Sequence, residues 1–265
     1  KDKTAEFLGR VIATRSAASI IAFSFVWVLY QQFELSYMWL YTLGGGVAVV
    51  IVFYCWQSFP MFPEKVTQTK KIILRKRYWL YYALQFMSGA RRQIFVVFAG
   101  FLMVEKFEFT VAEISMLLIA NAAINVVFAP KIGRLIQRFG ERKSLIFEYI
   151  GLSLIFAGYA FVESSEFAVF LYIADHLFFS IAIALKTYFQ KIADPADIAS
   201  SSGVSFTINH IAAVFIPVVF GLVWLYSPSL VFLAGSGMAI VSLILALNMP
   251  SKPALGNEVL IGKFS

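Results

Sequence analysis

Residues 133–143 read GRLIQRFGERK and form a basic segment between two long apolar runs. Gly133 opens the segment, Gly140 follows Arg138 by two residues, and Arg142 lies just beyond. Short connections rich in Arg and Lys are typical of the cytoplasmic side of membrane proteins. The segment therefore predicts a short basic turn that joins two membrane helices.

The composition of the whole chain points to the same class of protein. The 265 residues are 60% hydrophobic and only 14% charged, whereas soluble domains contain about 25% charged residues. Such a chain has too little polar surface to cover a globule, so most of it should lie in lipid. The single cysteine, Cys55, excludes an intramolecular disulfide.

Eight apolar stretches are long enough to cross a bilayer, which takes about 20 residues. We therefore predict an all-α integral membrane protein with eight transmembrane helices. The predicted spans are 11–30, 36–58, 78–103, 111–132, 144–162, 167–190, 203–226 and 229–249.

The basic residues are distributed unevenly between the two sides of the predicted membrane. Of the 22 Lys and Arg residues, 19 lie at the chain ends, in alternate connections or in the span ends beside them, and the opposite connections hold only Lys106. This asymmetry indicates that both ends of the chain are cytoplasmic. A net charge of +7 would suggest nucleic acid as the partner of a soluble protein, but here it reports topology, so no nucleic-acid partner is expected.

The segment 133–143 resembles the signature loop of the major facilitator superfamily, whose usual pattern is G-x-x-x-D-R-x-G-R-[RK]. That loop lies between helices two and three and recurs between helices eight and nine. Four residues match the pattern: Gly133, Arg138, Gly140 and Arg142. The resemblance implies that these four form a gating loop, although Gln137 replaces the usual Asp and cannot carry its charge.

The resemblance also implies a domain organisation, with the eight predicted spans as helices five to twelve of the family. Residues 1–58 would hold the last two helices of the N-terminal half, and residues 59–77 the cytoplasmic linker between the halves. Residues 78–250 would form the C-terminal six-helix bundle, and residues 251–265 a cytoplasmic tail. Four N-terminal helices are then missing, which fits either a fragment or a shortened paralogue whose partner chain supplies them.

A second stretch, residues 194–217, resembles helix eleven of the family, with the loop before it, in a prokaryotic branch whose substrates are mostly unassigned. This resemblance implies a prokaryotic inner (plasma) membrane. Asp197 and residues 200–202 lie where helix-capping oxygens are expected.

Charged residues inside the predicted spans are the main candidates for function, because each costs about 2.5–3.5 kcal/mol to place at the bilayer centre. Arg91 and Arg92 lie inside the third span and Asp175 inside the sixth, whereas Glu148 is placed near a span end. At about 1.5 Å per residue, Asp175 lies about 12 Å and the arginines roughly 16–18 Å from the same side. We predict that Asp175 faces one of these arginines across a central cavity, either in a substrate or coupling site or as a structural ion pair.

Further polar residues lie at similar depth and are predicted to line the same cavity: Asn121, Asn125, His176, Asn209 and His210. Each one alone is more typical of a hydrogen bond between membrane helices. His176 follows Asp175 and titrates near neutral pH in its ordinary state, which suggests proton coupling as a hypothesis.

The sequence contains no pattern typical of an enzyme or a metal protein. The two histidines lack the ligand spacing of a metal site, and neither a phosphate-binding glycine loop nor a nucleophile motif occurs. We therefore expect no metal, no cofactor and no catalytic residue.

Two functions from different classes fit these observations. The first is secondary active transport of a small solute by alternating access, and the two buried arginines favour an anionic solute. The second is a scaffold, assembly factor or subunit of a larger complex that derives from a transporter without transporting. The expected partners are the solute, membrane lipids and the missing helices.

Overall fold

The computed structural model describes residues 4–33, 36–60, 67, 69 and 73–263. Part of the predicted linker 59–77 and the extreme ends of the chain lie outside these residues. Within the described part, eight helical runs are long and apolar enough to cross a membrane, which confirms the prediction of an eight-span, all-α membrane protein.

The first two spans are single helices, α1 (Thr4–Phe33) and α2 (Tyr37–Ser58). The third span is composite and consists of η1 (Lys76–Tyr78), α3 (Trp79–Gln93), η2 (Ile94–Ala99) and α4 (Gly100–Phe107). The η2 segment is a π-helix that begins two residues after Arg92. Such segments are rare and occur frequently at functional sites.

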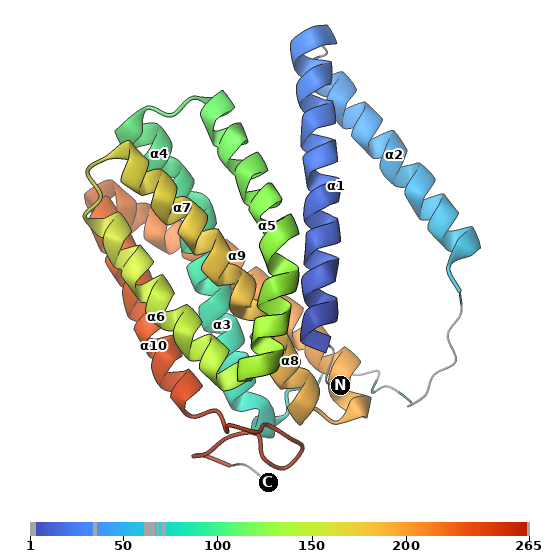
Figure 1. Cartoon of the computed structure of the whole chain (residues 1–265), viewed down its shortest axis with the longest axis vertical. Coiled ribbons are helices and arrows are strands. Elements are labelled where there is room, and N and C mark those ends of the chain that lie inside the picture. Colours follow the sequence, from blue (N-terminus) through green and yellow to red (C-terminus); the bar gives the residue numbers. More distant parts are fainter. Residues whose placement is uncertain (1–3, 34–35, 61–66, 68, 70–72, 264–265) are drawn as a thin grey trace.

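The other five spans complete the bundle. They are α5 (Val111–Phe139), α6 (Glu141–Ala160), α7 (Ser165–Phe179) with η3 (Ser180–Ala182) and α8 (Ile183–Ile192), η4 (Pro195–Asp197) with α9 (Ile198–Tyr226), and α10 (Pro228–Leu247). Figure 1 shows α3 to α10 packed side by side, with α1 against α5 and α2 standing apart. No residue from Met38 to Ser58 in α2 is buried.

The basic segment 133–143 is not the turn that we predicted. Helix α5 continues to Phe139, and only Gly140 separates it from α6, with φ 83° and ψ 161°. A positive φ of this kind is adopted readily by glycine. Residues 134–139 contain neither Gly nor Pro, so nothing in them interrupts the helix and the connection shrinks to a single residue.

Gly133 lies inside α5 and has a packing role there. A Cβ atom at Gly133 would lie 2.4 Å from the carbonyl oxygen of Ala5, and one at Gly9 would lie 2.4 Å from that of Ala129. The two helices therefore touch backbone to backbone through small residues four apart on each, a pattern common between membrane helices. This contact anchors α1 to the bundle.

The connections at one end of the molecule, which we call the basic end, are tied down by hydrogen bonds. This end holds residues 73–77, Gly140, the turn 193–197 and the C-terminal segment 248–263, and Figure 1 shows both chain ends there. Arg75 donates to both carboxylate oxygens of Asp197 from Nε and Nη2, each at 3.0 Å. Tyr188 Oη donates to the Glu258 carbonyl at 2.6 Å, and Trp79 Nε1 donates to the Gly262 carbonyl at 2.9 Å.

Candidate functional site

Arg91 is the largest fully buried side chain in the described structure, with 1% of its surface exposed. It lies in the last turn of α3, where its Nε donates to the Met87 carbonyl at 3.2 Å and its guanidinium carbon lies 4.6 Å from the centre of the Tyr149 ring. Neither Nη1 nor Nη2 has a hydrogen-bond partner among the described residues. A charged donor group is thus held in the interior mainly by an aromatic face.

Two buried carboxyl groups lie within electrostatic range of Arg91. Asp175 of α7 is 2% exposed, and Glu148 of α6 is fully buried. Arg91 interacts electrostatically with both carboxyls, and the two carboxyls interact with each other. In the part of the chain that the structure describes, no ion pair within 4.0 Å joins Arg91 to either carboxyl group.

Glu148 is the functional candidate that sequence reasoning missed. We placed it near a span end, but α6 begins at Glu141, three residues before the predicted span, so Glu148 lies about 10 Å inside the helix. The earlier start was readable from Gly140, since a glycine just before a charged first turn is a common helix boundary. With that start, Glu148 would have joined the buried charged residues.

Arg92 is the second predicted arginine, and its surroundings differ from those of Arg91. Its side chain is exposed, and its guanidinium carbon lies 5.3 Å from the centre of the Phe179 ring. It interacts electrostatically with Arg15 of α1, which is also exposed, and with His176 of α7. Among the described residues no acidic group forms an ion pair with Arg92, so no side-chain anion offsets the like charges of Arg92 and Arg15.

Asp175 and His176 are neighbours in sequence but have different surroundings. Successive residues on a helix do not face the same way, and His176 turns towards α5, where Asn121 Nδ2 donates to its Nδ1 at 3.2 Å. One turn further, Ser180 Oγ donates to Asn125 Oδ1 at 2.8 Å. These two bonds form a polar ladder between α5 and the composite span of α7 and η3.

The predicted pair on α9 is also split. Asn209 packs against α3, where a Cβ atom at Gly89 would lie only 2.6 Å from Asn209 Oδ1. His210 is exposed, and its Nδ1 donates to the carbonyl of Phe206 in its own helix at 2.8 Å. The structure therefore brings Asn209, but not His210, into the packing around α3.

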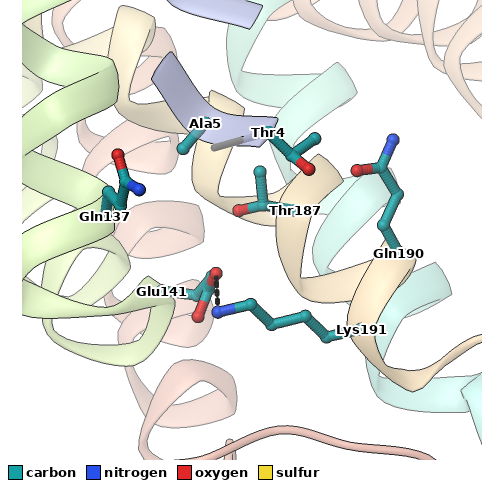
Figure 2. Close-up of a pocket in the computed structure, with 7 residues that line it drawn as sticks. All are labelled: Thr4, Ala5, Gln137, Glu141, Thr187, Gln190 and Lys191. Atoms are coloured by element: carbon teal, nitrogen blue, oxygen red, sulfur yellow. Dashed lines mark ion pairs between the residues drawn. The ribbon is translucent and has the colours of Figure 1, made fainter. Parts of the chain in front are cut away.

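A polar pocket lies at the basic end, and none of the four predicted gating residues is among the side chains that line it. Figure 2 shows this pocket, of about 270 Å³, between the start of α1, the junction of α5 with α6, and the end of α8. Glu141 is 4% exposed and pairs with Lys191 at 2.7 Å across the pocket. Gln137 also lines it, whereas Arg138 is exposed and its guanidinium lies against the Phe139 ring.

Arg142 binds the end of another helix. Its Nη2 donates to the Leu247 carbonyl at 2.9 Å, and its Nη1 donates to Ser251 Oγ at 3.3 Å. A cation at a helix C-terminus donates hydrogen bonds to the free carbonyls and interacts favourably with the helix dipole. This contact links α6 to α10, and both helices are spans of the predicted C-terminal bundle.

Asp197 does not cap α9, contrary to our expectation. The capping oxygen at this turn comes from Asp194, which accepts a hydrogen bond from the backbone nitrogen of Ala196 at 3.0 Å. Asp197 instead receives the guanidinium of Arg75 and the hydroxyl of Tyr78. The hydrogen bonds from Arg75 to Asp197 raise the pKa of the Arg75 guanidinium, which stays charged at every physiological pH.

The family comparison identifies the bundle that carries these residues. The sequence model of the Major Facilitator Superfamily matches residues 81–260, which include every charged residue of the interior site. No curated protein matches the chain.

Proposed function

Since this chain belongs to the major facilitator superfamily, a family of membrane transporters, we propose that it moves a small anionic solute by secondary active transport. In such proteins two helical bundles rock about a binding site near the middle of the membrane. The helices α3, α5, α7 and α9 would contribute the polar residues of that site.

The observation that carries the anionic preference is Arg92. This guanidinium is exposed inside a membrane-spanning helix, it interacts electrostatically with Arg15, and no acidic group forms an ion pair with it among the described residues. Two cations held together favour an anion between them. Arg15 belongs to α1 and Arg92 to α3, so an anion bound by both would bridge the two predicted halves.

The orientation and surroundings of the protein follow from the same proposal. We place the basic end in the cytoplasm because 19 of the 22 basic residues lie in the connections, chain ends and adjoining span ends predicted on that side. The resemblance of residues 194–217 supports a prokaryotic cell. Membrane lipids would contact the apolar faces. Four further helices, in the same protein or a partner chain, would cover α2, which has no buried residue from Met38 onwards. We expect no catalytic activity, no cofactor and no nucleic-acid partner.

A ligand screen on the full-length protein tests the anionic preference. The melting temperature would be measured with phosphate, sulfate, monocarboxylates and dicarboxylates, and with neutral sugars for comparison. A ligand at 100 times its Kd stabilises the folded state by about 2.7 kcal/mol. We expect one class of anion to raise the melting temperature, and the same anion to accumulate in proteoliposomes.

Substitutions then assign the effect to the site. Arg92→Gln should abolish the anion-dependent shift, and Lys143→Gln, which removes an exposed cation at the basic end, should retain it. Stabilisation by neutral sugars alone, or an unchanged shift in Arg92→Gln, would contradict the proposal.

A further inference from the structure

Glu148 is a buried acidic side chain that solute binding at Arg92 does not explain. It is fully buried in α6, and neither of its carboxylate oxygens has a hydrogen-bond partner among the described residues. An ionised carboxylate in an apolar interior without hydrogen bonds or an ion pair carries a large desolvation cost. The residue therefore calls for either a close cation or a proton.

The surrounding side chains supply one positive charge for two carboxylates. Among the residues that the structure describes, Arg91 is the one cation that interacts electrostatically with both Glu148 and Asp175. With all three groups ionised, this sealed cluster would carry one excess negative charge. One proton on either carboxyl would make the cluster neutral.

Other helices that contact α6 offer no second cation at this depth. α10 and η3 contain no ionisable side chain. On α7, Tyr172 interacts with Asp175 while His176 bonds to Asn121; within α6, Tyr159 also interacts with Asp175. On α8, Lys191 is paired with Glu141 at the basic end and Lys186 is exposed. On α5, Glu113 caps the helix start, and the basic residues 131, 134 and 138 lie in its last three turns.

We infer that Glu148, Asp175 and Arg91 form a buried proton-binding site that holds one exchangeable proton on one of the two carboxyl groups. This inference rests on the proposed transport function only for its purpose, which would be to couple proton movement to the solute. The proton comes from water, binds one carboxylate oxygen to give a neutral acid, and returns to water when the site opens. Arg91 stays charged throughout and shifts its guanidinium towards whichever carboxyl is ionised.

The contacts of Arg91 suit such a shift. Within the described part of the chain neither Nη atom has an acceptor in hydrogen-bond geometry, and the Tyr149 face beneath the guanidinium attracts the charge without fixing its direction. The sealed position of Arg91 also separates it from Arg92, whose exposed side chain is accessible to a solute. Adjacent arginines on one helix would then serve two tasks, proton balance and anion binding.

Infrared spectroscopy of the full-length protein in lipid bilayers tests the site without any solute. The carbonyl stretch of a protonated carboxyl, identified by its shift in D₂O, would be followed between roughly pH 5 and 9, the range in which strongly perturbed buried acids titrate. We expect one such group per chain in the parent protein, with an amplitude that falls as pH rises. Glu148→Gln leaves Arg91 balanced by Asp175, so the band should disappear.

A second variant and a control keep the result decisive. Asp175→Asn leaves Arg91 balanced by Glu148 and should also remove the band, while Glu163→Gln, in the exposed connection after α6, should leave it unchanged. A band that persists in both interior variants, or that does not change with pH in the parent protein, overturns the inference. If the interior variants lose the band but the parent protein takes up no anion, the proton site stands and the transport proposal is refuted. If the parent protein takes up anion and the pH dependence of uptake is unchanged in Glu148→Gln, the transport proposal stands and the proton site is refuted.

Discussion

At the basic end of the molecule Arg75 forms two hydrogen bonds with Asp197, whereas in the described interior Arg91 interacts electrostatically with Glu148 and Asp175 but forms no hydrogen bond with either. The first group is half exposed on the arginine side, and its carboxylate also accepts from Tyr78 at 3.3 Å. The second group is sealed from solvent.

This difference separates a fixed contact from one that can change state. A bidentate guanidinium–carboxylate pair satisfies its own donors and acceptors and holds one geometry. A buried cation shared by two carboxyls has several arrangements of similar energy, because moving one proton exchanges the partners. The outer pair therefore holds the linker against the start of α9, and the interior group suits a cycle of proton binding and release.

The largest expected effect comes from removing the shared cation. Arg91→Met leaves two buried carboxyls without a counter-charge, which should destabilise the protein by about 3–5 kcal/mol near neutral pH. The loss should shrink as pH falls, because protonation makes both carboxyls neutral. Melting temperatures measured against pH check this, with the exposed Arg92→Met as control at roughly 0.5 kcal/mol or less. A loss that is independent of pH would show that Arg91 serves packing alone.

Asp197→Asn should have the next largest effect, on the outer pair. The amide cannot accept both guanidinium hydrogen bonds, and hydrogen bonds to charged groups contribute about 1.5–3 kcal/mol. We expect a loss near the lower end of that range, together with faster proteolysis between residues 67 and 77. Glu166→Gln, an exposed acid on α7, provides the reference. If both variants have the same stability and the same rate of proteolysis, the contact between Arg75 and Asp197 does not stabilise the linker.

Arg75→Lys should lower the melting temperature less than Asp197→Asn does. Lysine keeps the positive charge but has one ammonium group in place of the planar fork that reaches both oxygens. The measurement is the same thermal unfolding experiment at one pH. If lysine restores full stability, charge alone and not bidentate geometry holds the linker.

Salt should give the smallest effect and should act on one region only. Raising the ionic strength from 0.1 to 1 M shortens the screening length from about 10 to 3 Å. The gap in melting temperature between the parent protein and Asp197→Asn should narrow, because Arg75 is half exposed, while the gap for Arg91→Met should hold. Equal narrowing of both gaps would mean that solvent reaches the interior charges.

The fold was largely predictable from the chain, because crossing a bilayer imposes a length and composition that can be counted along the sequence. All eight spans were found, and the errors lay at their ends. The segment 133–143 was taken as a turn because its charges stood out, but charge alone does not end a helix, and only Gly140 does so here.

The candidate site was predicted less well, and the reasons are specific. Depth along a span placed Arg91 and Asp175 at similar levels, and the structure brings them within electrostatic range. Depth says nothing of rotation about the helix axis, so it did not separate buried Arg91 from exposed Arg92. It also did not place His176 towards α5 while Asp175 faces the interior.

The sequence by itself determined that the chain is a bundle of eight membrane helices with its positive charges gathered on one side, because hydrophobic length and charge asymmetry are properties of the chain read in order. Only the tertiary structure decided which charges share a neighbourhood. Glu148 meets Arg91, and Asp197 meets Arg75, across dozens of intervening residues. Such pairings depend on how helices rotate and pack against one another, and that is fixed by contacts such as Gly133 on Ala5 rather than by any local pattern.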